Sequence, residues 1–234
     1  MSDMNTYEFG HHGGVLASRE TRNRTLRNTY ALLALSMLPT ALGAWVGIQF
    51  GFSFFAGSPF IGFMAFMAIA FGFFWGIERT KNSGMGVVLL LAFTFFMGLM
   101  LSRMLGMALG MQNGAQLIGT AALGTGGIFF GLASYASVTK RDFSNMGKFL
   151  FVGVMVLLFA SLANIFLQLP ALSLTISALA VGIFSLYLLF DLKRIMDGGE
   201  TNYITATLSV YLDLYNIFVN LLHLLMAFTG NSRD

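Results

Sequence analysis

An ionisable side chain lies deep inside the last apolar stretch of the chain. Asp213 stands ten residues after the start of the stretch from Tyr203 to Phe228, which contains no Lys or Arg. A carboxylate at such depth in a membrane is costly, and it normally turns inward toward a partner or a water-filled cavity. We therefore predict a functional role for Asp213, with a purely structural hydrogen bond between helices as the alternative.

A polar stripe accompanies Asp213 along the same helix face. Its other members follow at intervals of three or four residues, the spacing that places side chains on one side of a helix. They are Ser209, Asn216, Asn220 and His223. Because the rest of the stretch is mostly apolar, the stripe predicts a helix that other helices surround or that lines a pathway. Hydrogen bonds that only hold the bundle together are the alternative, above all for the two asparagines.

Asp191 adds a second carboxylate at the end of the preceding apolar stretch. If the two stretches form an antiparallel hairpin around Gly198 and Gly199, Asp191 and Asp213 face each other at similar depth. Two carboxylates in a medium of low dielectric constant cannot both ionise cheaply, so they would share a proton unless a metal ion or an arginine neutralises them. The pair would then be a pH-sensitive latch. For Asp191 alone, an ordinary carboxylate at a helix end is the alternative.

Seven apolar stretches must position these side chains. Each is close to the ~20 residues that a helix needs to cross ~30 Å of hydrocarbon. The sequence therefore predicts an all-α membrane protein with seven transmembrane helices over residues 30–228, between a polar tail over residues 1–29 and a short tail over residues 229–234. The stretches are Tyr30–Phe50, Phe54–Ile77, Gly84–Arg103, Ala115–Ala136, Phe149–Gln168, Ala171–Phe190 and Tyr203–Phe228.

The composition agrees with this class. Only 10% of the residues are charged and 56% are hydrophobic, whereas soluble domains carry about 25% charged residues. The chain has no cysteine, which excludes disulfides and thiolate metal sites. Its net charge of +3 comes from basic residues beside the apolar stretches, where they orient a membrane protein instead of binding nucleic acid.

The basic residues alternate from one side of the predicted membrane to the other. The first tail and every second loop after it hold eleven of the thirteen Lys and Arg residues, and Arg103 and Arg233 are the other two. Because basic residues gather on the cytoplasmic side of a bilayer, we expect a bacterial inner-membrane protein with a cytoplasmic amino terminus and a periplasmic carboxyl terminus.

Two pairs of glycines have the small-xxx-small spacing that permits close packing of membrane helices. Gly127 and Gly131 lie in the fourth stretch, and Gly106 and Gly110 lie near the end of the third. We predict a packing role for the first pair and, with less support, for the second. Chance is the alternative, since the chain has 27 glycines.

The last quarter of the chain resembles a known family. The segment from Tyr187 to Ile195 (YLLFDLKRI), followed by that from Tyr211 to Phe218 (YLDLYNIF), resembles the paired motifs of the transmembrane Bax inhibitor motif family. The segments from Asn164 to Pro170 (NIFLQLP) and from Gly198 to Ile204 (GGETNYI) are similar to its bacterial YccA-like branch. The resemblance covers about Arg27 to Phe228.

This resemblance implies a seventh helix ringed by the other six and, in some members, a pH-sensitive calcium leak gated by an aspartate pair at the positions of Asp191 and Asp213. It also implies a latch arginine at the cytoplasmic end of the second helix, for which Arg79 is the candidate. Glu78, its neighbour, is an alternative partner for Arg79. For the YccA-like branch, the resemblance implies association with the membrane AAA protease FtsH.

Two function hypotheses follow. The first is a regulatory partner of FtsH that the protease engages by the amino-terminal tail, and the second is a proton-gated cation leak. We do not expect an enzyme, because the sequence has no Gly-x-Ser-x-Gly motif, and Leu212 and Leu214 stand where an intramembrane aspartyl protease would have glycine. We expect no cofactor beyond transient calcium, and we expect His11 and His12 to be solvated and not to bind a metal.

Overall fold

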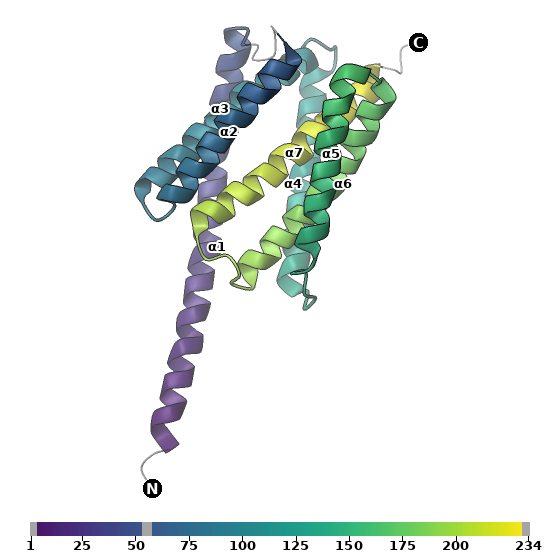
Figure 1. The fold of residues 1–234 in the computed structure, drawn as a ribbon. Coiled ribbons are helices and arrows are strands. Elements are labelled where there is room, and N and C mark those ends of the chain that lie inside the picture. Colours follow the sequence, from purple (N-terminus) through teal and green to yellow (C-terminus); the bar gives the residue numbers. More distant parts are fainter. Residues whose placement is uncertain (1–3, 53–57, 231–234) are drawn as a thin grey trace.

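Seven helices make up the described part of the chain, residues 4–52 and 58–230 of a computed structural model (Figure 1). Each of the seven predicted stretches coincides with one helix, and no strand occurs in the described residues. The helices are α1 (Met4–Gln49), α2 (Pro59–Thr80), α3 (Gly84–Leu109), α4 (Gly114–Val138), α5 (Met146–Leu167), α6 (Pro170–Met196) and α7 (Tyr203–Gly230).

All seven helices are long and apolar enough to cross a membrane, with residues 20–49 as the relevant part of α1. The predicted class, an all-α membrane protein with seven transmembrane helices, is confirmed. The division between α5 and α6 has a clear local cause. Gln168 adopts the left-handed conformation with φ of 51°, and Pro170 occupies the first turn of α6, where its missing N–H costs nothing.

The predicted amino-terminal tail is helical. α1 begins at Met4 and continues without interruption into the first transmembrane span, and Figure 1 shows it projecting beyond the other helices. Its 46 residues correspond to about 70 Å at 1.5 Å per residue, more than twice the ~30 Å of hydrocarbon. The polar tail predicted over residues 1–29 is therefore helical from Met4 onward. The segment from Val15 to Thr29 contains no Gly or Pro to stop a helix that extends from the span.

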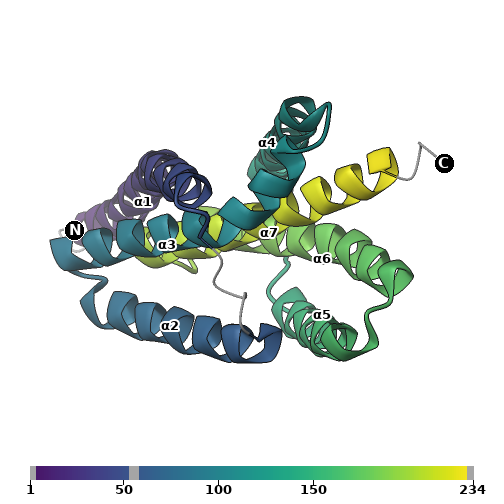
Figure 2. The same ribbon diagram turned by 90° about the horizontal axis from the view of Figure 1, so that it is seen from above.

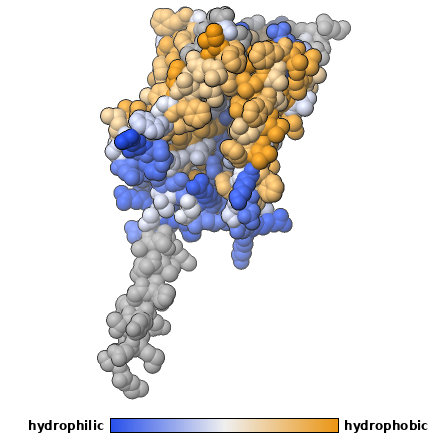
Figure 3. All heavy atoms as spheres, viewed as in Figure 1, coloured by the Kyte–Doolittle hydropathy of each residue, from blue (hydrophilic) through white to orange (hydrophobic). Residues whose placement is uncertain are grey.

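One end of the bundle collects the basic residues. The loops α2–α3, α4–α5 and α6–α7 lie at the lower end of the bundle in Figure 1, the end from which α1 projects, and hydrophilic residues gather there below a broad hydrophobic band (Figure 3). We call it the basic end, after Lys81, Lys140, Arg141, Lys193 and Arg194. The predicted alternation of charged loops is therefore seen in the structure, and the orientation of this end toward the cytoplasm stays a prediction.

Helix α7 contacts five other helices. It packs against α1, α2, α3, α4 and α6, whereas α5 packs against α6, on whose outer side it lies in Figure 2. Several α7 residues are fully buried, including Ile204, Val210, Ile217 and Leu222. The more detailed expectation of six helices ringed around α7 is not confirmed.

The close helix crossing lies between α1 and α3. A Cβ atom at Gly43 would lie 2.1 Å from the carbonyl oxygen of Phe95, and one at Gly98 would lie 2.1 Å from that of Thr40. Only glycine permits this approach of two backbones. The crossing therefore depends on these two positions.

The glycine pairs that the sequence analysis selected do not pack in this way. A Cβ atom at Gly106, Gly127 or Gly131 would meet nothing within 4 Å, and one at Gly110 would meet only its own helix. The predicted packing role of both pairs is therefore wrong within this chain. Two glycines four residues apart give a helix a face without side chains at those positions. The spacing does not show whether another helix packs against that face.

Candidate carboxylate site

Asp191 on α6 and Asp213 on α7 meet across the antiparallel hairpin. The two carboxyl groups are close enough for the charge of one to act on the other. Asp213 is only 4% exposed and Asp191 is half-buried. The α6–α7 hairpin therefore places the two side chains near each other. Two carboxylates in such contact need a shared proton or a cation between them.

One oxygen of Asp213 has no partner. Oδ2 is fully buried and accepts no hydrogen bond from the described part of the protein. A buried acceptor without a donor is destabilising, so this atom marks a position for a proton, a water molecule or a cation. Beside the pair is a cavity of about 10 Å³, which is room for at most one water molecule. The cavity is lined by Asp191, Arg194, Ile195, Glu200, Ala206 and Ser209.

The turn after α6 places Glu200 against Arg194. Gly198 has φ of +82°, a conformation that glycine adopts without strain. Its N–H donates to the carbonyl oxygen of Ile195 at 3.1 Å, and the N–H of Gly199 donates to that of Arg194 at 2.8 Å. These two bonds form a Schellman motif, which ends the helix and reverses the chain. Glu200 Oε2 then lies 3.9 Å from Arg194 Nη2.

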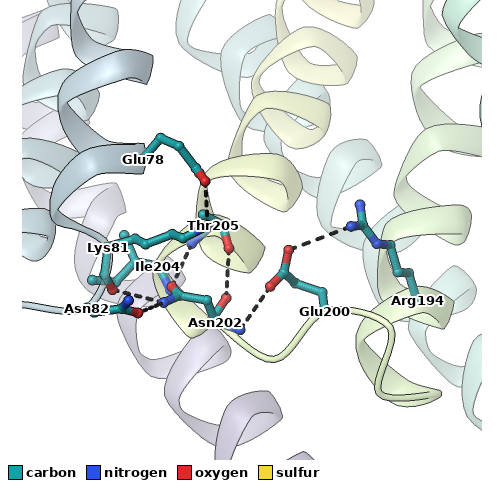
Figure 4. A network of polar contacts seen from close by, with 8 residues as sticks. All are labelled: Glu78, Lys81, Asn82, Arg194, Glu200, Asn202, Ile204 and Thr205. Carbon is teal, nitrogen blue, oxygen red and sulfur yellow. Dashed lines mark hydrogen bonds and ion pairs between the residues drawn. The ribbon is translucent and has the colours of Figure 1, made fainter.

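Asn202 begins α7 and ties it to the α2–α3 loop (Figure 4). Its Oδ1 accepts hydrogen bonds from the N–H groups of Ile204 at 2.9 Å and Thr205 at 3.3 Å, as a helix N-cap does. Its Nδ2 donates to the carbonyl oxygen of Lys81 and to Oδ1 of Asn82, both at 2.9 Å. Asn202 thus positions the helix that carries Asp213. Its place in the sequence motif GGETNYI did not reveal this role.

Helix α1 holds the same hairpin from another side. Thr25 Oγ1 donates to the carbonyl oxygen of Thr201 at 3.0 Å, and Thr207 Oγ1 lies 3.3 Å from that of Thr29. The loop between α6 and α7 is therefore joined to α1 by side-chain hydrogen bonds. A movement of α1 near Thr25 and Thr29 would therefore also displace the α6–α7 turn next to the carboxylate pair.

Two tyrosines anchor the other faces of α7. The hydroxyl of Tyr211 lies 2.8 Å from Thr40 Oγ1 on α1, and the hydroxyl of Tyr215 donates to the carbonyl oxygen of Met97 on α3 at 3.2 Å. Tyr211 and Tyr215 flank Asp213 in sequence. Their hydrogen bonds therefore fix the position of α7 along its axis, and its rotation about that axis, at the residue that carries the carboxylate. Nothing in their spacing alone identified these partners.

The structure does not bring Arg79 to the carboxylate pair. Its guanidinium carbon lies 5.2 Å from the centre of the Trp75 ring, a cation–π contact. The ion pairs in the described residues are Lys81 with Glu78, Lys193 with Asp197, and Arg194 with Glu200. Glu78 therefore pairs with Lys81, and the alternative pairing of Glu78 with Arg79 is not seen either.

Arg194 is the cation whose charge acts on Asp191. It follows Asp191 by three residues in the last turns of α6, a spacing at which side chains of one helix are neighbours. The spacing of Asp191 and Arg194 is visible in the sequence, whereas the family resemblance implies a latch arginine on the second helix.

The polar stripe of α7 divides into parts with different partners. Ser209 lines the small cavity, and His223 Nδ1 lies 2.9 Å from Ser177 Oγ on α6. The amide of Asn216 donates to the carbonyl oxygen of Leu212, and that of Asn220 to the carbonyl oxygen of Asn216, both at 2.8 Å. The ends of the stripe therefore meet α6, whereas the two asparagines donate within α7.

The described residues contain no group of three or more His, Asp or Glu side chains arranged to hold a metal ion. Asp191 and Asp213 together offer two carboxylates, and calcium takes six to eight oxygen ligands. Two carboxylates alone therefore do not complete a calcium site. His11 and His12 fall within α1, and their side chains lie outside the part of the chain that the structure describes.

Comparison with known proteins places this arrangement in a family. Residues 22–230 match the family model described as Inhibitor of apoptosis-promoting Bax1. An uncharacterized protein of Neisseria meningitidis serogroup A is 40% identical over 212 residues, which are 90% of this chain and 93% of that protein. The predicted resemblance is thereby confirmed.

Relatives in Escherichia coli have descriptive names. The protein named Modulator of FtsH protease YccA from Escherichia coli K12 is 39% identical over 203 residues, covering 87% of this chain and 90% of that protein. The same values hold for the protein of Escherichia coli O6:H1 named Inner membrane protein YccA.

Proposed function

This chain belongs to the family of inhibitors of apoptosis-promoting Bax1, and on that premise we propose that it binds and modulates the membrane AAA protease FtsH. It is a multi-pass inner-membrane protein. The observation that carries the proposal is its similarity, over most of both chains, to the E. coli protein named as a modulator of that protease. The role is regulatory, and we propose no catalytic step for the chain itself.

The shape of α1 supports this proposal. A protease that acts on membrane proteins needs a segment outside the bilayer to engage, and α1 extends well beyond the other helices (Figure 1). The hydrogen bonds of Thr25 and Thr207 connect α1 with the α6–α7 hairpin. We further propose that the basic end faces the cytoplasm, where positively charged loops are retained.

Co-purification tests the binding. FtsH is expressed with the tagged full-length chain, with a variant that lacks residues 2–18, and with Asp213→Asn as the control. We expect the full chain and Asp213→Asn to retain FtsH and the deletion to lose most of it. Equal recovery of FtsH with the deletion would show that the extension of α1 is not the contact, and no recovery with any form would contradict the proposal.

A proton-gated cation leak is the second candidate function. It is favoured by one observation, the contact between Asp191 and Asp213 beside an unpartnered, buried Oδ2 atom. A cation or a second proton at this atom would change the charge of the pair, and with it the attraction or repulsion between α6 and α7. The two functions are compatible, because a protein that docks on a protease can also conduct ions.

A further inference from the structure

Two residues of the small cavity at the basic end each line a surface pocket as well. Arg194 lines the small cavity beside the carboxylate pair and also a surface pocket of about 340 Å³ with Asp142 and Lys193. Glu200 lines the same small cavity and a second surface pocket of about 410 Å³ with Arg22 and Thr201. These two side chains therefore stand between the small cavity, which Asp191 lines, and the two surface pockets.

We propose that the ion pair of Arg194 and Glu200 is the closure that separates Asp191 and Asp213 from water at the basic end of the bundle. Removal of either charge would open the small cavity to one of the two pockets. The inference goes beyond both proposed functions, since it concerns access to the carboxylates whatever their role is.

The two partners of the closure are held differently. Glu200 is fixed by the turn, because its Oε1 accepts the N–H of Asn202 at 2.9 Å and its own N–H lies 3.3 Å from the carbonyl oxygen of Arg194. The side chain of Glu200 is 22% exposed and that of Arg194 is 49% exposed. The Arg194 side chain is therefore the mobile partner of the closure, and the Glu200 side chain, held by the turn, is the fixed partner (Figure 4).

The strength of the contact suits a closure that opens repeatedly. The charged atoms are 3.9 Å apart, and partly exposed ion pairs of this kind are weak. Arg194 also attracts an ionised Asp191, while Glu200 repels it. Two carboxylates on either side thus compete for one guanidinium, so a shift of Arg194 toward Asp191 would release Glu200 without leaving the arginine unpaired.

Thiol labelling tests the proposal, because the chain has no cysteine of its own. Ser209 lines the small cavity, and Ser209→Cys introduces a single thiol of similar size. The full-length protein in lipid nanodiscs, with both faces reachable, is treated with a charged thiol reagent that does not enter the membrane. We expect slow labelling with the ion pair intact, and about fivefold faster labelling after Glu200→Gln or Arg194→Gln, as the loss of one partly exposed ion pair implies.

Two controls separate the closure from general loosening. Lys193→Gln breaks the neighbouring ion pair of Lys193 with Asp197, at 2.8 Å, but neither residue lines the small cavity, so the labelling rate should not change. A thiol at Ser177, at the other end of the α6–α7 interface, should stay unlabelled in every variant. The exchanged pair, Arg194→Glu with Glu200→Arg, should restore slow labelling.

The proposal is overturned if Glu200→Gln and Arg194→Gln leave the labelling of Ser209→Cys unchanged, or if Lys193→Gln accelerates it equally. Because labelling requires neither FtsH nor ion flux, these results are independent of whether either proposed function is correct.

Discussion

Asp191 and Asp213 bring their carboxyl groups together across the α6–α7 hairpin, and Asp213 Oδ2 is buried there without a donor. The helices on either side leave little freedom to relieve this contact, since Tyr211 and Tyr215 bond to α1 and α3 and Asn202 caps the start of α7. The charge state of the pair is therefore the variable element in an otherwise fixed arrangement.

Calcium flux into liposomes tests the gate. If the pair controls a leak, flux through the wild-type protein should change between about pH 6 and about pH 8, because the proton shared by the carboxylates competes with a cation. Asp213→Asn removes one of the two charges and should make the flux insensitive to pH. Absence of flux above that of empty liposomes at any pH, with the protein folded and inserted, would exclude the leak and leave protease modulation as the function.

The α1–α3 crossing predicts opposite effects for two similar substitutions. Gly43→Ala places a methyl group 2.1 Å from a backbone oxygen, so the helices must separate, and we expect destabilisation of about 1–3 kcal/mol. Gly127→Ala is the matched control, because its methyl group meets open space and alanine favours the helix by about 0.5–1 kcal/mol. Thermal unfolding in detergent measures both. A Gly43→Ala variant as stable as the wild type would contradict the close crossing.

Asn202 should stabilise the hairpin in two separable ways. Asn202→Ala loses the cap of α7 and both bonds to the α2–α3 loop, and we expect it to cost about 1–2 kcal/mol. Asn202→Asp keeps the acceptor that caps α7 but loses the donor, so its unfolding temperature should fall between those of the wild type and Asn202→Ala. Equal unfolding temperatures for the two variants would show that only the bonds to the α2–α3 loop matter.

The loop between α4 and α5 supplies a prediction about pH. The backbone N–H of Ser144 donates to Asp142 Oδ1 at 2.8 Å, and this bond, with the Ser144 hydroxyl and the charge of Lys193, lowers the pKa of Asp142. A lowered pKa stabilises the folded state above the ordinary pKa of the group, and this stabilisation is lost as the pH falls through the folded value.

Asp142→Asn should therefore be less stable than the wild type at neutral pH and equally stable in strong acid. Unfolding of both proteins across the acid range measures the difference. A difference that persists unchanged at the lowest pH would mean that the charge of Asp142 is not its cause.

The sequence predicted the elements well, because their signals are local. Apolar runs near 20 residues marked every span, and Pro170 with the polar Gln168 marked the turn that separates α5 from α6. The nearness of Asp191 and Asp213 also has a local cause, since two helices joined by a short loop run antiparallel and bring their facing residues to similar depth.

Contacts between distant segments were the part that the sequence did not reveal. Gly106–Gly110 and Gly127–Gly131 have the spacing that favours close packing, yet the glycines that the packing of α1 on α3 requires are Gly43 and Gly98. Asn202 has the residue type of a cap, but its bonds to Lys81 and Asn82 span about 120 residues. The family resemblance pointed to Arg79 at the end of α2 as the arginine near the carboxylates. In the structure the arginine near Asp191 is Arg194, on the same helix α6.

The central claim is that the protein modulates FtsH, and proteolysis in a reconstituted membrane tests it most directly. Purified FtsH and a membrane protein that it degrades are placed in liposomes with ATP, and the degradation rate is measured with increasing amounts of this protein. We predict a rate that changes and saturates with the full chain and changes much less with the variant lacking residues 2–18, while Asp213→Asn acts like the wild type. A degradation rate that stays constant at every amount of the folded, inserted protein would contradict the account.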